Sequence, residues 1–303
     1  MSSLILLVFS LSCTTVLAQE IPSISSVVFL DSFVVTAQRA DFNTDDFIAL
    51  VQEDDSFYEA FLNLRYLNYS SSNIISIKDK NGIAAAGYIA QTKQQMTGDS
   101  CREVHILEEQ IEGNYYQRKR KPRYYTARMY ERLFFTTEGQ VCEDDESTSK
   151  GLIETRVDAL KRLIFQPGKR VQVPFIADKT AIFSKKMQVY YDYAITSKLY
   201  DDTIDCYVFS VQAKPDFKEG KTVIKQLATY FDKSTFQVVA RQYHLKYAGT
   251  AFDFDVRMNI ELGKLGIRYI PTYLDYEGFW KIPTQKAERV QFETTFYDFQ
   301  GIE

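Results

Sequence analysis

The 303-residue chain has only two histidines and a single tryptophan, and it lacks the short motifs of common catalytic sites. His105 and His244 stand in separate strand-like contexts, "REVHILEE" and "QYHLKY", where a structural or surface role is expected. No Cys-x-x-Cys, His-Glu-x-x-His, Gly-x-Ser-x-Gly or phosphate-loop pattern occurs. Carboxylate pairs such as Asp201-Asp202 are common on turns and wet strand faces, so none stands out as glycosidase-like. The sequence indicates no catalytic residue, cofactor or metal site, and leaves an enzyme of unknown type as an alternative.

The charge balance argues against a nucleic-acid partner. The net charge is −4, and 45% hydrophobic with 25% charged residues is the balance of a folded globular protein. One basic run, "RKRKPR" at Arg118 to Arg123, is interpreted as a solvated connector that ends at Pro122. A contact with phosphate or anionic lipid is the alternative for this run.

After the N-terminus, no stretch approaches the roughly 18 apolar residues that a transmembrane helix needs. The apolar run Leu4 to Leu11, followed by the small residues around Ala18, predicts a signal peptide over residues 1–18. No lysine or arginine precedes the run, which departs from the usual signal. Lipidation of Cys13 is an alternative, although the residues before it fit a lipobox poorly. We expect an exported protein, periplasmic or outer-membrane associated, with peripheral membrane contact possible.

Cysteine is scarce in the expected mature chain, which retains Cys101, Cys142 and Cys206. Cys101 and Cys142 lie in polar, turn-like contexts, so a disulfide between them is plausible in an oxidising compartment. It would close a loop of about 40 residues, worth roughly 3–4 kcal/mol in the chain-entropy model. Three reduced cysteines are the alternative. Cys206 lies in a strand-like segment and is expected to act as a small buried hydrophobe.

Helical patterns are confined to the N-terminal part, residues 25–167. Asn43 or Thr44 can cap a first helix, and Ser56 opens a second with a capping box to Glu59. Further helices are predicted from Tyr124 and over residues 152–165. Strands are predicted over residues 25–38 and 74–107, the latter interrupted by the hairpin signal "DKNG".

Alternating apolar and polar residues predict a β-meander over residues 168–303. The longest alternation, "FDFDVRMNIEL", runs from Phe252 to Leu262 without a slip. Aromatic residues make up 15% of the chain, which also favours β structure. Strands this long must twist and curl. The fold class is therefore α+β, with a large curved antiparallel sheet, a half-barrel-like meander, and helices on or across its concave face. Residues 19–303 are expected to form one domain.

The segment "YVFSVQAKPDFKEGKTVIKQLATYFDKSTFQVVARQYHLKY" is similar to the periplasmic carriers of outer-membrane lipoproteins, a half-barrel family. The resemblance covers residues 183–299. It rests on a strand with an "AKP" exit, a second strand that runs into Asp232 at a turn, and a third strand after it. It implies an apolar concavity that holds acyl chains without catalysis. The chain is longer than the family pattern, and the segment Ser25 to Phe165 has no counterpart in it.

Phe252, Phe254, Val256 and Met258 are the candidate lining of such a concavity. The plainer interpretation is that these side chains pack against the protein's own helices. The sequence thus predicts an exported, non-catalytic envelope protein that binds a lipid or an acylated protein. A structural or interaction protein of the envelope, without a small ligand, is the alternative. Ligand identity and oligomeric state are not encoded in these patterns.

Overall fold

The computed structural model describes residues 44–98, 101–133, 139–142, 163, 168–171, 176–218, 220–249, 253–282 and 285–300. The predicted signal peptide, the strand segment 25–38, Asn43, the helix 152–165 apart from Leu163, and Phe252 lie outside these residues. The single domain over 19–303 stays a prediction.

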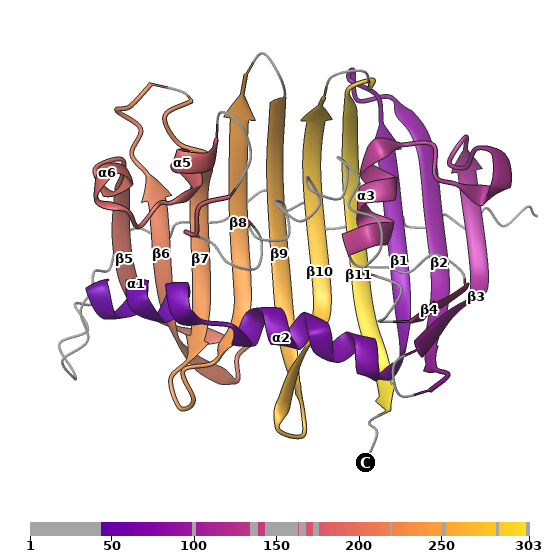
Figure 1. Cartoon of the computed structure of the whole chain (residues 1–303), viewed down its shortest axis with the longest axis horizontal. Coiled ribbons are helices and arrows are strands. Elements are labelled where there is room, and N and C mark those ends of the chain that lie inside the picture. The colour runs from indigo at the N-terminus through magenta and orange to yellow at the C-terminus, as the bar shows by residue number, and fades with distance from the viewer. Residues whose placement is uncertain are drawn as a thin grey trace, which may run out of the picture. The chain divides into compact units, whose positions relative to one another are not determined.

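One antiparallel sheet of eleven strands dominates the described part of the chain (Figure 1). Its spatial order is β4-β3-β2-β1-β11-β10-β9-β8-β7-β6-β5. The strands are β1 (Asn68–Lys78), β2 (Ala84–Met96), β3 (Cys101–Gly113), β4 (Gly139–Cys142), β5 (Tyr191–Tyr200), β6 (Ile204–Ala213), β7 (Ile224–Asp232), β8 (Val238–Ala248), β9 (Asp253–Leu265), β10 (Arg268–Lys281) and β11 (Glu288–Gln300). The predicted large antiparallel sheet is confirmed.

The sheet consists of two meanders joined at β1 and β11. Strands β5 to β11 follow one another in space as they do in sequence, as the β-meander predicted over residues 168–303 requires. Strand β1 then pairs with β11, so that Asn73 lies opposite Thr294 and Ile75 opposite Phe292. The N-terminal part of the chain therefore extends the C-terminal meander by four strands.

Two of the turns show why the chain reverses where it does. The Asp79 carboxylate accepts hydrogen bonds from the backbone N–H groups of Asn81 (2.8 Å) and Ile83 (3.0 Å). Gly82 takes φ of 83°, a conformation that costs glycine little. In the turn after β7, the Asp232 carboxylate likewise accepts from the N–H of Ser234 at 2.7 Å.

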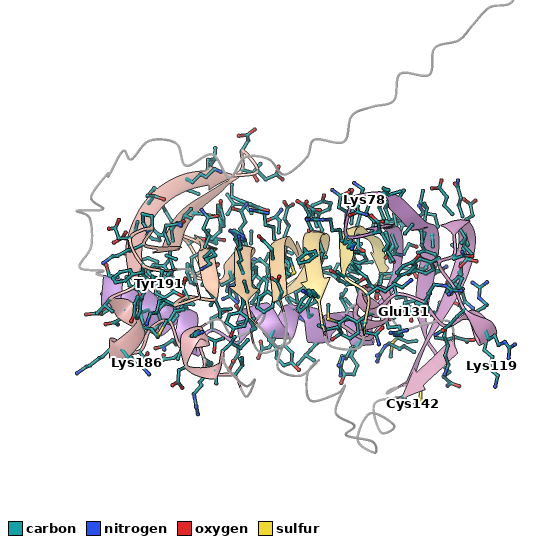
Figure 2. All side chains as sticks on the ribbon, turned by 90° about the horizontal axis from the view of Figure 1, so that it is seen from above. Lys78, Lys119, Glu131, Cys142, Lys186 and Tyr191 are labelled. Atoms are coloured by element: carbon teal, nitrogen blue, oxygen red, sulfur yellow. A yellow bond between two sulfur atoms is a disulfide. The ribbon has the colours of Figure 1, made fainter. Side chains whose placement is uncertain are left out.

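Short helices cover one face of the sheet. They are α1 (Thr44–Glu53), α2 (Ser56–Asn63), α3 (Tyr125–Leu133), α5 (Ala177–Thr180) and α6 (Lys185–Gln188), with 3-10 turns η1 (Leu64–Tyr66) and η2 (Arg118–Arg120). In Figure 1, α1 and α2 run end to end across the strands, and α3 lies over β11 and β1. Figure 2 shows the sheet bending around them, so this covered face is the concave one. No helix in the described residues is long and apolar enough to cross a membrane.

The starts of α1, α2 and α3 follow the sequence signals, with one correction at α2. A second correction concerns α5 and α6, which lie in residues 168–303, where only a β-meander was predicted; helices of four residues are too short to show a helical period in the sequence. Asp45 and Asp46 lie in the first turn of α1, where the helix dipole favours acidic side chains. Helix α2 begins at Ser56, but the expected capping box does not form, because Asp55 is the cap residue and no side chain caps it. Instead, the hydroxyl and N–H of Ser56 both donate to the Asp54 carboxylate.

The core lies between the helices and the concave face. From α1, the Phe47 ring contacts the rings of Tyr207 (5.6 Å), Phe209 (6.0 Å) and Phe231 (5.8 Å) on β6 and β7. From α2, Phe57 and Ala60 are also buried in the same cluster. Burying one large apolar side chain contributes about 1.5–3 kcal/mol. Packing, more than helix propensity, therefore keeps these short helices in place.

At the edge of the sheet, Cys101 on β3 faces Cys142 on β4, and the two form a disulfide with an S–S distance of 2.06 Å. Cys206 is a free cysteine with 0% exposure on β6. The basic run forms an exposed turn around η2, in which the Arg120 guanidinium pairs with the Glu109 carboxylate at 2.7 Å.

Candidate ligand-binding face

The candidate lining residues on β9 point to the concave side. Phe254, Val256 and Met258 are each 3% exposed, whereas Arg257 between them is exposed. Their burial agrees with the alternation of the sequence. It does not distinguish a ligand from packing by the chain itself, so their role in binding stays a prediction.

A continuous row of aromatic rings crosses β8 to β11 on this face. The Phe254 ring lies 6.2 Å from Tyr247 on β8 and stacks on Trp280 of β10 at 5.2 Å. The Trp280 indole N–H donates a hydrogen bond of 2.6 Å to the Tyr276 hydroxyl. The aromatic row, as named below, comprises Tyr247, Phe254, Trp280, Tyr276, Tyr130 and Phe292.

Helix α3 supplies one member of the aromatic row. Its Tyr130 ring stacks on Phe292 of β11 at 4.4 Å and meets Tyr276 edge-on at 4.9 Å. The helix is held there by Glu288, a carboxylate on the concave side of β11 that is 7% exposed. Glu288 accepts from the backbone N–H groups of Tyr125 (3.1 Å) and Thr126 (3.0 Å), and from the Thr126 hydroxyl (2.8 Å). A carboxylate at a helix N-terminus is stabilised by these donors and by the helix dipole.

A buried ion pair fixes the junction of α1 and α2 to β8. Arg241 is 0% exposed, and its guanidinium lies 3.1 Å from the carboxylate of Asp54, which stands between the two helices. The same guanidinium donates to the Thr229 hydroxyl at 3.3 Å and lies 4.4 Å from the centre of the Phe57 ring. Sequence reasoning missed this contact. An arginine in the inward register of an alternating strand was the available signal, but its partner is 187 residues away.

The tyrosines of this face carry neutral hydroxyls. Burial raises the pKa of Tyr276 to about 12, against smaller opposing effects of its hydrogen bonds with Tyr130 and Trp280. Burial also raises the pKa of Tyr243 to about 12, with Arg241 acting in the opposite direction. These phenols therefore remain protonated at any physiological pH, and they present no charge to the concave side.

Tyr191 and Tyr193, on β5, differ in how their hydroxyls are satisfied. Tyr193 donates to the backbone carbonyl of Ile182 at 2.9 Å. Tyr191 is 2% exposed, and its hydroxyl has no hydrogen-bond partner in the described part of the chain. A buried polar group without a partner costs about 1–3 kcal/mol of stability.

The convex face carries polar and charged groups. His244 on β8 contacts the Asp255 carboxylate at 2.8 Å, and His105 is a half-exposed neighbour of Glu103 at 3.6 Å. The sequence predicted a structural or surface role for each histidine; His244 is half-buried and His105 is exposed. The described residues contain no group of three or more histidine, cysteine or acidic side chains arranged to hold a metal ion.

No protein-family model and no curated protein matches the chain. Among solved structures, it is similar to a DUF1329 family protein from Desulfovibrio piger, with 11% identity and a TM-score of 0.25, over 85% of this chain and 91% of that one. It is also similar to a domain described as an outer membrane lipoprotein-sorting protein from Vibrio parahaemolyticus, with 8% identity and a TM-score of 0.30, over 86% and 95% of the two chains.

A LolA superfamily protein from Nitrosomonas europaea is similar at 9% identity and a TM-score of 0.22, over 82% of this chain and 92% of that one. Two of these similar structures carry descriptions from the lipoprotein-carrier proteins that residues 183–299 resemble in sequence.

Proposed function

We propose that this protein is an exported, non-catalytic protein of the cell envelope that binds the apolar chain of a lipid or a lipid-modified protein on its concave face. The observation that supports this most is the aromatic row. Its members Phe254, Trp280, Tyr276, Tyr130 and Phe292 are buried, and at its β8 end the half-buried Tyr247 ring lies 4.8 Å from the Lys179 ammonium. The row is continuous across four strands, and its rings come from residues far apart in sequence.

The composition of the row favours an acyl chain over a polar ligand. Phe254, Trp280 and Phe292 offer flat apolar surface, and the Tyr276 hydroxyl already accepts a hydrogen bond from the Trp280 indole. On such a surface, affinity increases with the apolar area of the ligand that is buried, and the ligand needs no particular arrangement of polar groups. The charged groups that lie near the helices, Arg241 and Glu288, are both engaged with the chain's own groups.

The helices over this face are short, and polar contacts anchor them at the junction of α1 and α2 and at the start of α3. Helices α1 and α2 have 10 and 8 residues, and α3 has 9. An acyl chain can replace their apolar contacts with the sheet while these anchoring contacts stay in place, so that no hydrogen bond is left unmade. The alternative, a structural protein whose helices fill the face permanently, makes the opposite prediction for the following experiment.

Trp280 is the only tryptophan of the chain and lies within the aromatic row, so its fluorescence reports on occupancy of the face. We would titrate the full chain with a brominated long-chain fatty acid methyl ester, whose bromine atoms quench tryptophan on contact. Saturable quenching is expected, and the unbrominated ester should compete without quenching. Absence of quenching at any concentration would remove the proposal and favour the structural alternative.

Two matched variants locate the binding. Phe254→Ala removes a ring that stacks on Trp280 and should weaken binding about tenfold, equivalent to about 1.4 kcal/mol. Phe279→Ala removes a ring of the same size from the convex face of β10, where it lies under Arg289, and should leave affinity unchanged. Because Phe254→Ala can also destabilise the fold, native mass spectrometry of the unaltered chain, purified without detergent, supplies a second readout. A co-purified lipid-sized mass that is lost on denaturation is expected.

A further inference from the structure

Tyr191 lies on β5, the edge strand at the end of the sheet opposite to β4, and its hydroxyl is buried. Tyr191 begins β5, opposite Ala213 on β6, and its side chain lies on the concave side that the helices cover (Figure 2). It belongs to the same buried cluster as Ile182, Phe183 and Met187. A phenol surrounded by apolar groups loses its hydrogen bonds to water on folding, and the described part of the chain offers this hydroxyl no replacement.

The neighbouring tyrosine shows that the fold can satisfy a hydroxyl at this end of the sheet. Tyr193 stands two residues further along the same face of β5 and donates to the Ile182 carbonyl at 2.9 Å. Its ring lies 6.5 Å from that of Tyr191. The two residues are thus a natural pair, one hydroxyl satisfied by a backbone carbonyl and the other buried without an acceptor among the residues that the structure describes.

An apolar path connects Tyr191 with the aromatic row. Val211 on β6 lies opposite Leu227 on β7, and Leu245 on β8 lies opposite Val256 on β9. These four side chains are at most 3% exposed and all face the concave side. From β5 to β9 there are four strand spacings, about 19 Å in total. That distance is comparable to the extended length of a long acyl chain.

We propose that Tyr191 is the head-group-recognition residue of this face, donating its hydroxyl hydrogen bond to the carbonyl oxygen of a neutral ester or amide at one end of an acyl-chain ligand. The assignment rests on the proposed function, and it specifies the ligand class as amphiphiles with an uncharged acceptor.

The surroundings favour a neutral head group over an ionised one. Burial, with a smaller contribution from Tyr193, raises the pKa of the Tyr191 phenol well above its usual value, and no charged side chain among the described residues contributes. The phenol is thus a permanent neutral donor. An ionised carboxylate placed beside it would be buried without a cation and would be penalised by desolvation.

The test uses the Trp280 signal with two probes, a brominated fatty acid methyl ester and a brominated alkane of equal chain length. Tyr191→Phe deletes only the hydroxyl. It should weaken ester binding about tenfold and leave alkane binding unchanged. Without ligand, its thermal midpoint should rise by about 2–4 °C, because an unsatisfied buried group has been removed. Tyr193→Phe is the matched control, and it should lower the midpoint while preserving the preference for the ester.

Two results would overturn the assignment alone. One is that both probes bind but Tyr191→Phe changes their affinities equally or not at all. The other is that Tyr191→Phe lowers the midpoint as Tyr193→Phe does, which would mean that a buried water already satisfies the hydroxyl. If neither probe quenches Trp280 in the unaltered chain, the proposed function and the assignment fall together.

Discussion

The two faces of the central strands differ in how their charged side chains are placed. On the concave face, Val256 and Met258 of β9 are buried, and the charged side chains Arg241 and Glu288 each have several partners. On the convex face, Asp275 of β10 lies directly opposite Glu293 of β11, a pairing of like charges. Water explains the difference, since it screens charges on the convex face and is excluded from the concave one.

The comparison also indicates where a ligand can be accommodated. Among the described residues, the buried charged side chains Arg241 and Glu288 of the concave face are already paired, so an apolar or neutral group is favoured beside them. The convex face tolerates charge because its groups remain partly hydrated. A face whose buried charges are paired is suited to an acyl chain. The first two sets of variants below place an unpaired charge on this face.

The largest effect is expected when a charge is placed on the concave face. Met258→Asp puts a carboxylate at a position that is 3% exposed, opposite Tyr243 and Tyr276. Burial of an unpaired charge should cost more than about 4 kcal/mol and unfold the protein. Arg257→Gln, at the adjacent exposed position, should change stability by less than about 1 kcal/mol. Thermal unfolding of both variants is the measurement, and an unchanged midpoint for Met258→Asp would contradict the inward assignment.

A smaller loss is expected when one partner of the buried ion pair is removed. Arg241→Leu leaves the Asp54 carboxylate largely buried without its guanidinium and should cost about 3–5 kcal/mol. Adding Asp54→Asn should recover much of that loss, because the stranded charge is gone. On the convex face, Lys246→Ala breaks a pair with Asp255 at 3.6 Å and should cost less than about 1 kcal/mol. Urea unfolding of Arg241→Leu, of Arg241→Leu with Asp54→Asn, and of Lys246→Ala gives the three stabilities. Equal losses of stability for Arg241→Leu and Lys246→Ala would contradict the proposed difference between the two faces.

The strands, their facing and most helix starts could be predicted from the sequence, because alternation and capping are local patterns. Pairing between β1 and β11 could not, since apolar periodicity does not identify a partner strand. In the structure, the Thr294 hydroxyl of β11 donates a hydrogen bond to the Asn73 side chain of β1, a partner 221 residues away in sequence. The aromatic row was missed for the same reason. Of the residues in the aromatic row, only Phe254 was predicted as lining. Trp280 and Tyr130 join the row through tertiary contacts, which a short stretch of sequence does not contain.

The smallest effect is expected from Asp275, and it depends on pH. Loss of hydration, followed by the charge of Glu293 and smaller effects of Glu277 and Glu261, raises the pKa of Asp275 to about 6. An unfolded aspartate titrates near about 3.9. Between these values the folded state binds more protons than the unfolded state, so stability falls as pH rises from about 4 to 6. The loss is complete above the folded pKa.

Asp275→Asn removes this cost, so the variant should be more stable than the unaltered chain at pH 8 and nearly equal to it at pH 4. The gain at pH 8 should be about 1 kcal/mol, less than the full shift implies, because the carboxyl is partly exposed and screened by solvent. Asp253→Asn, on the same face at the start of β9, serves as the control and should leave the difference between the two pH values unchanged. Urea unfolding at both values decides the matter. A gain that is equal at pH 4 and pH 8 would show that the asparagine stabilises by packing, and that the opposed carboxylates are tolerated on the convex face without measurable cost.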